Sequence, residues 1–123
     1  MKTDILLVYP KLDYFDFTEG LVEPPLGLYA IAAPCVKKGY TVTIIDQRIE
    51  SSWEEIIYDI LSNHPICVGI GSMSGPQLFH TMNLVRWIKK NFPNQLIVIG
   101  GPHATMLPDQ VISVPEVDIV VPL

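Results

Sequence analysis

Short hydrophobic runs alternate with segments of helical pattern along the whole chain. The runs are rich in isoleucine, leucine and valine, and they occupy residues 5–8, 41–46, 66–71, 96–99 and 117–121. The segments between them predict helices at 26–38, 52–62, 76–91 and 108–113. Uninterrupted apolar strands separated by helices are typical of a parallel sheet that helices cover on both faces. The pattern therefore predicts a doubly wound α/β domain with right-handed crossovers.

The predicted helices carry recognisable ends. Gly39 closes the helix at 26–38, and Ser52 is the expected N-cap of the next helix. Ser72 and Ser74 precede the helix at 76–91 and are expected to cap it. Within that helix, apolar residues at helical spacing form the stripe expected to face the core: Leu78, Met82, Val85 and Ile88 or Lys89.

Composition narrows the class of protein. The chain has 123 residues, of which 49% are hydrophobic and 17% charged, so it suits one domain with a substantial core. Its net charge of −5 and the absence of a long basic cluster disfavour nucleic-acid binding. No apolar run is long enough to span a membrane, and the first residues lead into a strand rather than a signal peptide. Cys35 and Cys67 do not form a Cys-x-x-Cys pair, which favours buried thiols in a reducing cytoplasm.

Ligands in open α/β sheets bind at the carboxyl ends of the strands. The third and fourth predicted strands end in the small, glycine-rich segments 71–75 and 100–103, which predict a groove whose floor is backbone. Gly100 and Gly101 have two interpretations, a tight turn or the close approach of a large ligand, and the neighbouring serines favour the ligand.

Several common occupants of such a groove lack their motifs. The first strand-to-helix loop contains no Gly-x-Gly-x-x-Gly, and the chain contains no Gly-x-x-x-x-Gly-Lys-[Ser/Thr] phosphate loop. No Gly-x-Ser-x-Gly nucleophile elbow and no aspartate ending the third strand occur. His64, His80 and His103 do not cluster, so neither a metal site nor a catalytic residue is predicted.

Three stretches together carry a specific resemblance: PPLGLYAIAAPCVKKGYTVTIID at 24–46, VGIGSMSG at 68–75 and IVIGGPHATMLPDQVI at 97–112, with EVDIVV at 116–121 also in keeping. In order and spacing they resemble the cobalamin-binding domain at the N-terminus of cobalamin-dependent radical S-adenosylmethionine (SAM) enzymes. The resemblance implies a flavodoxin-like, three-layer fold with strand order 2-1-3-4-5. It also implies that cobalamin lies across the carboxyl ends of the strands.

The resemblance assigns twelve residues to the cofactor site. Ser72 and Ser74 would hydrogen-bond the nucleotide tail, Gly100 and Gly101 would allow close approach, and Leu26 would belong to a neighbouring wall. The full set is Tyr9, Pro10, Leu26, Gly27, Ser72, Met73, Ser74, Gly75, Gly100, Gly101, Pro102 and His103.

Departures from the family pattern refine this expectation. The loop at 10–16 contains no histidine, so cobalamin would bind without a protein histidine ligand on cobalt. The chain also lacks a Cys-x-x-x-Cys-x-x-Cys motif. We therefore interpret residues 1–123 as one cobalamin-binding domain, a fragment that performs no catalysis alone. Its parent would be a methyltransferase or cyclase whose C-terminal radical SAM domain holds SAM and a 4Fe–4S cluster.

Two alternatives stay open: a cofactor-free docking or substrate-recognition module of the same fold, and a half-domain of a nucleotide-sugar or flavin enzyme. The expected partner is the radical SAM domain, and the loop aromatics Tyr14, Phe15 and Phe17 favour a contact with it. Self-association is also expected, because no helix follows the fifth strand to cover its side chains. The residues expected to be uncovered are Val117, Ile119 and Val121.

Overall fold

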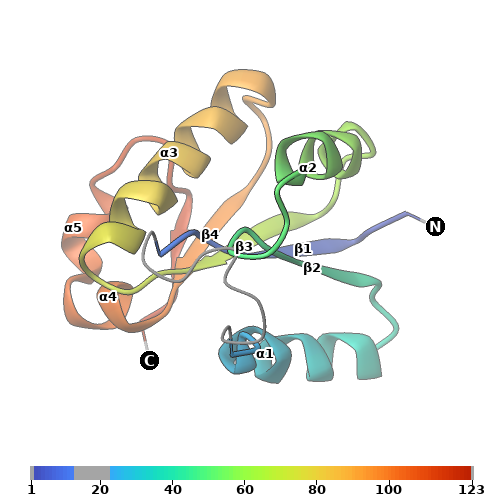
Figure 1. Cartoon of the computed structure of the whole chain (residues 1–123), viewed down its shortest axis with the longest axis horizontal. Helices are drawn as coiled ribbons and strands as arrows, with labels where there is room; N and C mark the ends of the chain where they lie inside the picture. Colours follow the sequence, from blue (N-terminus) through green and yellow to red (C-terminus); the bar gives the residue numbers. More distant parts are fainter. Residues whose placement is uncertain (1, 13–22, 123) are drawn as a thin grey trace.

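Five parallel strands form one sheet in the computed structural model, which describes residues 2–12 and 23–122. The aromatic residues of the loop at 13–22 lie outside the described residues. The strand order is β2-β1-β3-β4-β5, which confirms the predicted flavodoxin-like sheet (Figure 1). In chain order the elements are β1 (Ile5–Tyr9), α1 (Leu26–Lys37), β2 (Val42–Asp46), α2 (Trp53–Ser62), β3 (Cys67–Gly71), α3 (Pro76–Asn91), β4 (Ile97–Gly100), α4 (Pro102–Met106), α5 (Pro108–Ile112) and β5 (Ile119–Val120).

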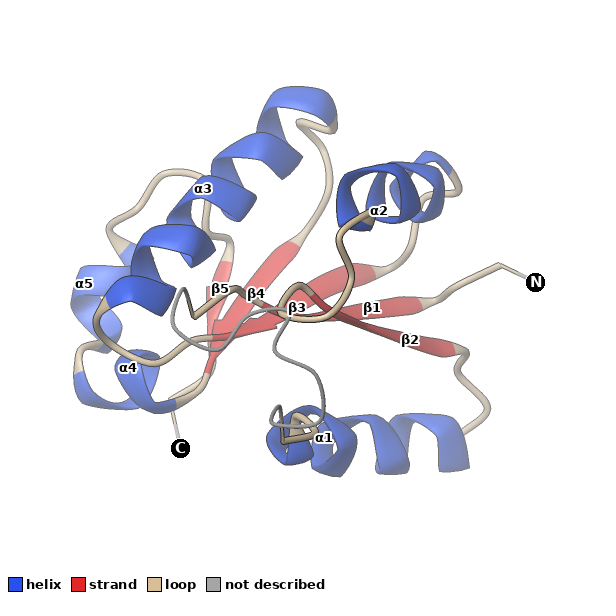
Figure 2. Ribbon diagram, viewed as in Figure 1, coloured by secondary structure: helices blue, strands red, loops and turns tan. Residues whose placement is uncertain are grey.

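One face of the sheet carries the main core. Because side chains alternate between faces along a strand, every second residue points to the same side. Leu6, Val8, Val68, Ile70 and Ile97 belong to one buried cluster with residues of α2 and α3. Those two helices lie together on one side of the sheet in Figure 2, and α4 and α5 also contribute side chains to the cluster.

The opposite face is covered by α1, the helix drawn alone below the sheet (Figure 2). Leu7, Leu28 and Ala32 form a smaller core cluster there over β1 and β2. The row continues from Leu7 through Gly69 and Val98 to Ile119, because these residues are register neighbours across the sheet. A Cβ at Gly69 would lie 2.7 Å from Leu7 Cδ2, so a larger residue there requires the end of that leucine side chain to shift.

The end of the chain agrees only in part with the sequence prediction. Ile119 and Val121 are exposed, at 42% and 44%, as expected. Val117 is 6% exposed, so the prediction that it is uncovered was wrong. It lies before β5 and packs into the main core cluster.

The core-facing stripe of α3 was predicted correctly only in its second half. Leu78 and Met82 are only partly buried, whereas Gln77, Thr81 and Leu84 are buried together with the correctly predicted Val85 and Ile88. The true stripe is thus rotated by about one residue, and two polar side chains occupy its first positions. These two polar residues become important at the carboxyl edge of the sheet.

The capping prediction holds for position at α2 but fails at α3, and neither helix has a side-chain cap. Ser52 is the N-cap of α2, yet its side chain makes no capping hydrogen bond, and its φ of −93° and ψ of 24° differ from the extended backbone of a capping serine. Gly75 occupies the N-cap of α3, so capping by Ser72 and Ser74 was wrong. Their hydroxyls bond elsewhere, as described below.

Candidate functional site

The sheet order brings the exits of β1, β3 and β4 side by side at one edge. β3 lies between the other two, and Gly71 at its end is the register neighbour of Gly100 at the end of β4. Ten of the twelve predicted site residues follow or end these three strands. Leu26 and Gly27 instead begin α1, which covers the face of the sheet opposite α2 and α3. The start of α1 adjoins the same edge, because a Cβ at Gly71 would lie 3.7 Å from Leu28 Cδ2.

The β3 exit loop, residues 72–75, is fastened to the start of α4 by backbone hydrogen bonds. Ser72 N donates to Gly100 O at 3.1 Å, and His103 N donates to Ser72 O at 3.0 Å. Gly101 lies between them with a φ of +90°, and a Cβ there would be 2.8 Å from Ser72 N. Gly101 is therefore required by the turn itself, in addition to any role beside a ligand.

His103 joins the β3 exit loop to α5. It is 5% exposed, its Nδ1 lies 2.7 Å from Ser74 Oγ, and its Nε2 lies 2.8 Å from Gln110 Oε1. Gln110 was not predicted as part of the site. Because each ring nitrogen lies within hydrogen-bond distance of a partner, the histidine links the β3 exit loop to α5. Within residues 2–12 and 23–122, no three His, Cys, Asp or Glu side chains gather closely enough to hold a metal ion.

Two further residues that the sequence reasoning missed lie beneath the same loop. Gln77 Nε2 donates to Pro10 O at 3.0 Å, and Met73 N donates to Gln77 Oε1 at 2.8 Å. Thr81 Oγ1 lies 2.9 Å from Ser72 Oγ. Their spacing of four residues, in phase with Leu84 and Ile88, was the available signal: two polar residues on a core-facing stripe.

The β3 exit loop, residues 72–75, consists of small or apolar residues and carries no charge. Met73 is 40% exposed and Leu26 is 69% exposed. A Cβ at Gly27 would meet no atom within 4 Å, so packing within the described chain does not explain this glycine. The space above Gly75 is also open, but its φ of +88° by itself favours glycine. A helical glycine such as Gly27 costs about 1 kcal/mol relative to alanine. An edge of this kind fits a bulky, flat ligand that needs room close to the backbone.

The exit of β2 has a different character. Arg48 and Asp46 form a buried ion pair in which Nη2 lies 2.8 Å from Oδ2 and Nε lies 3.0 Å from Oδ1. The guanidinium carbon also lies 4.2 Å from the centre of the Tyr9 ring. Tyr9 therefore contacts Arg48, which follows β2.

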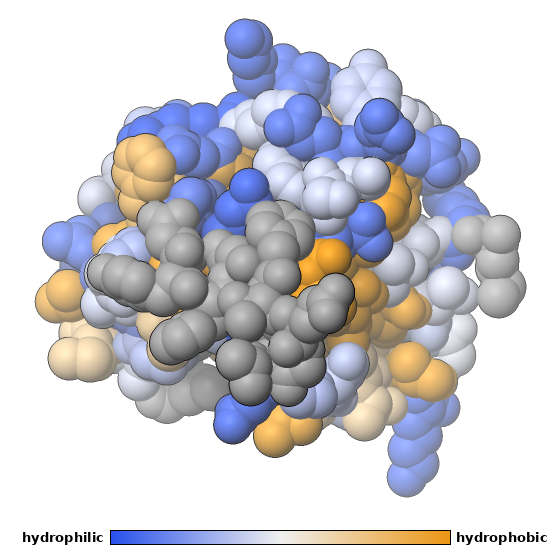
Figure 3. Space-filling view, in the orientation of Figure 1, coloured by the Kyte–Doolittle hydropathy of each residue, from blue (hydrophilic) through white to orange (hydrophobic). Residues whose placement is uncertain are grey.

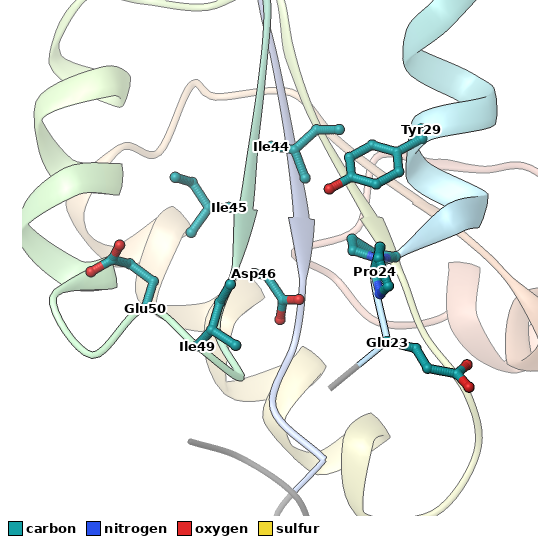
Figure 4. Close-up of a pocket in the computed structure, with 9 residues that line it drawn as sticks. Glu23, Pro24, Tyr29, Ile44, Ile45, Asp46, Ile49 and Glu50 are labelled. Carbon is teal, nitrogen blue, oxygen red and sulfur yellow. The ribbon is translucent and has the colours of Figure 1, made fainter. Parts of the chain in front are cut away.

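A cavity of about 300 Å³ lies beside this ion pair. Figure 4 shows Asp46 and Tyr29 near the same space, with Pro24 beside them. The residues that line the cavity are Glu23, Pro24, Pro25, Tyr29, Ile44, Ile45, Asp46, Ile49 and Glu50. None of them is among the twelve predicted site residues.

Fold and edge together define a doubly wound α/β domain built to bind a ligand at the carboxyl ends of its strands. The sequence profile of the B12 binding domain family matches residues 18–122. The chain belongs to this family.

Two curated proteins that resemble this chain are named methyltransferases. An uncharacterized methyltransferase from Pyrococcus horikoshii is 32% identical over 107 residues, which cover 85% of this chain and 23% of that protein. Cytidylyl-2-hydroxyethylphosphonate methyltransferase from Streptomyces wedmorensis is 27% identical over 134 residues, which cover 94% of this chain and 25% of that protein. The chain thus spans about a quarter of the length of these relatives. No solved structure gives a significant match.

In the parts of the chain that the structure describes, no helix has the length and apolarity needed to cross a membrane.

Proposed function

We propose that this domain binds cobalamin across the carboxyl ends of β1, β3 and β4. Membership of the B12 binding domain family supports the identity of the ligand. The observation that carries the location is the open space above Gly27 and Gly75, beside an uncharged loop. The chain's own role is to hold the cofactor, orient it and shield it from water with apolar surface.

Bound cobalamin supplies a cobalt centre that can carry a methyl group. The loop between β1 and α1 contains no histidine in the sequence, so in our proposal no side chain of this loop ligates cobalt through an imidazole. The domain then contributes no reacting group, and the chemistry belongs to the cofactor and to a catalytic partner.

We further propose that the partner is a radical SAM catalytic domain that holds SAM and a 4Fe–4S cluster, and that the whole protein is a methyltransferase. The two relatives named above are methyltransferases, and the match covers about a quarter of each. The resemblance of 24–46, 68–75 and 97–112 to cobalamin-dependent radical SAM enzymes supports the radical chemistry.

Two surfaces support contact with a partner. Of the twelve residues of α1 only Lys37 is charged, and a helix that is apolar on all sides is normally buried. Its exposed side chains include Leu26, Tyr29, Ile31 and Val36. Figure 3 shows hydrophobic side chains in the lower part of the view, where α1 lies, and more hydrophilic ones at the top, over α2 and α3.

The exposed Ile119 and Val121 extend this apolar surface, and in the absence of another partner we expect the isolated chain to self-associate through it. Sedimentation velocity at several protein concentrations tests this expectation. A chain that stays strictly monomeric over the whole range would contradict it.

We also propose that the protein works in a reducing cytoplasm, where Cys35 and Cys67 remain thiols. Burial raises the pKa of the Cys67 thiol, and the neighbouring Cys35 raises it further. The thiol is therefore protonated at neutral pH, which limits its reactivity.

The test of cofactor binding is spectroscopic. Hydroxocobalamin is mixed with the purified chain, free cofactor is removed by desalting, and the visible spectrum of the protein fraction is recorded. The expected result is retained cobalamin absorbance, with saturation in a titration. A colourless protein fraction and no saturable titration would contradict the proposal and favour the cofactor-free docking module.

A matched pair of variants tests the location. Gly27→Leu introduces a side chain into open space on α1 and should leave the fold intact, since leucine is the better helix former. Ala30→Leu places the same side chain at an exposed position of the same helix. We expect hydroxocobalamin binding to weaken at least about tenfold for Gly27→Leu, because the new side chain occupies ligand space. Equal affinities of the two variants would exclude this location.

A further inference from the structure

Gln77 is a buried glutamine that joins two loops at the carboxyl edge. Its side chain is part of a residue that is 1% exposed, at the start of α3. The amide Nε2 donates to Pro10 O at 3.0 Å, and the amide Oε1 accepts from Met73 N at 2.8 Å. Pro10 follows β1 and Met73 follows β3, so one side chain bridges the exits of two neighbouring strands.

The bridge joins two exit loops beyond the last paired residues of their strands. The chain leaves β1 toward β2 on one side and leaves β3 toward β4 on the other, so the two exit loops diverge. The register of β1 with β3 ends at Val8 and Ile70. By contrast, β3 stays joined to β4 through Gly71 and Gly100 and one residue beyond, by the bond from Ser72 N. Gln77 continues the connection between β1 and β3 past the end of their ladder.

Packing alone does not explain a glutamine at this position. A leucine or methionine would fill similar volume without the cost of desolvating an amide. The amide instead has both of its ends satisfied by backbone groups of separate loops, which rigidifies the loops that it joins.

We propose that Gln77 is a positioning residue for the cofactor edge: it fixes the β3 exit loop at a set distance from the β1 exit, and thereby sets the affinity for cobalamin. This inference rests on the proposed function. Gln77 is too deeply buried to contact the cofactor, so its effect passes through Met73 and the loop at 72–75.

The chain supplies a matched control at the other end of the sheet. Gln95 is also buried, at 8% exposed, and its Nε2 also donates to a proline carbonyl, that of Pro65 at 3.2 Å. Pro65 precedes β3 and Gln95 precedes β4, so this bridge lies at the amino ends of the strands. Gln77→Leu removes the bonds to Pro10 and Met73 at the carboxyl ends, and Gln95→Leu removes the bonds from Nε2 to Pro65 O and, at 3.3 Å, to Leu96 O at the amino ends.

The first measurement is hydroxocobalamin affinity by titration. We expect Gln77→Leu to weaken binding at least about tenfold and Gln95→Leu to change it less than about twofold, while both variants lose similar thermal stability. Equal affinities of the two variants overturn the inference. If Gln77→Leu does not fold, Gln77→Met and Gln95→Met, which keep an unbranched side chain, are compared in the same way.

The second measurement needs no cofactor. Amide hydrogen exchange of Met73, followed by NMR, should accelerate in the Gln77 variant and stay unchanged in the Gln95 variant. If the wild-type chain does not bind hydroxocobalamin, the proposed function fails, and this measurement decides the inference. Faster Met73 exchange in the Gln77 variant alone then supports the positioning role, and unchanged exchange overturns it.

Discussion

The two ends of the sheet are held together by different means. At the amino ends, side-chain anchors at partly exposed positions fix the strands: Lys89 Nζ lies 2.8 Å from Asp118 Oδ2, and Ile97 N donates to the same carboxylate oxygen at 2.8 Å. Most of the buried polar side chains of the described chain lie at the carboxyl ends, with Arg48, Gln77 and His103 as examples, whereas Thr3 and Gln95 are the buried polar residues at the amino ends. Left-handed backbone occurs at both ends of the sheet. Burying polar groups costs free energy, so their concentration at one end marks that end as the functional one.

The largest loss of stability is expected from breaking the buried ion pair at the carboxyl end of the sheet. Arg48 and Asp46 have side-chain exposures of only 7% and 8%, and Arg48 also donates to Glu23 O at 2.6 Å. Replacing Arg48 by methionine leaves the Asp46 carboxylate buried without its partner. We expect a loss of about 3–5 kcal/mol in the free energy of unfolding, measured by urea denaturation.

The control for Arg48→Met is the double variant with Asp46→Asn, which removes the unpaired charge as well. It should recover part of the lost stability, because much of the penalty is the uncompensated carboxylate. A loss below about 1 kcal/mol for the single variant would indicate that water reaches the pair, as it does for surface ion pairs.

Two glycines with positive φ, one at each end of the sheet, allow the stability of the two ends to be compared directly. Gly101 at the carboxyl end has a φ of +90° and no room for a Cβ, whereas Gly39 at the amino end has a φ of +97° and open space around it. An alanine at Gly39 pays only for the left-handed backbone, about 1 kcal/mol. An alanine at Gly101 also overlaps the Ser72 backbone, which adds about 1–3 kcal/mol.

Thermal and urea denaturation of Gly101→Ala and Gly39→Ala measure this difference. If the two variants are equally stable, the β3 exit loop moves aside freely, and the edge is not preformed as the structure indicates. Because Gly101 is needed for folding, the pair of variants at Gly27 and Ala30 is the cleaner probe of ligand binding.

The sequence predicted the sheet because its strands are short, apolar runs that cannot be mistaken for amphipathic helices. Residues 66–71 and 96–99 are of this kind, and the observed β3 and β4 differ from them by one residue at their ends. The parallel sheet in turn predicted where the ligand-binding edge lies, because the carboxyl ends of parallel strands meet at one edge. The resemblance to a known family added the strand order, which hydrophobic pattern alone does not give.

The polar interior of the edge was not predicted, and the reason is physical. A hydrophobic pattern predicts that Gln77 and Thr81 lie on the surface, because burying an amide or a hydroxyl is unfavourable unless the fold supplies it with hydrogen-bond partners. Those partners, Pro10 O and Ser72 Oγ, come from other elements of the fold. The same limit applies to Val117, whose burial depends on how the chain turns before β5.

The smallest expected effect is at the amino end, in the pH dependence of Asp118. Partial desolvation alone would raise the pKa of this carboxyl group, but hydrogen bonds from Lys89 and from Ile97 N, together with the Lys89 charge, lower it below its ordinary value of 3.8. A carboxylate with a lowered folded-state pKa stabilises the fold fully above the pKa of the unfolded chain. That contribution disappears as the pH falls through the folded-state pKa.

The pair is partly exposed, so we expect the contribution to stay below about 1 kcal/mol. Urea denaturation of the wild-type chain and of Asp118→Asn between pH 3 and 7 gives the difference in unfolding free energy. The difference should be constant near neutral pH and should shrink in acid, where the wild-type aspartate gains its proton. A difference that grows as the pH falls would reverse the sign of the pKa shift. It would also mean that the charged pair of Lys89 and Asp118 does not stabilise the amino end, so the two ends would no longer differ in this respect.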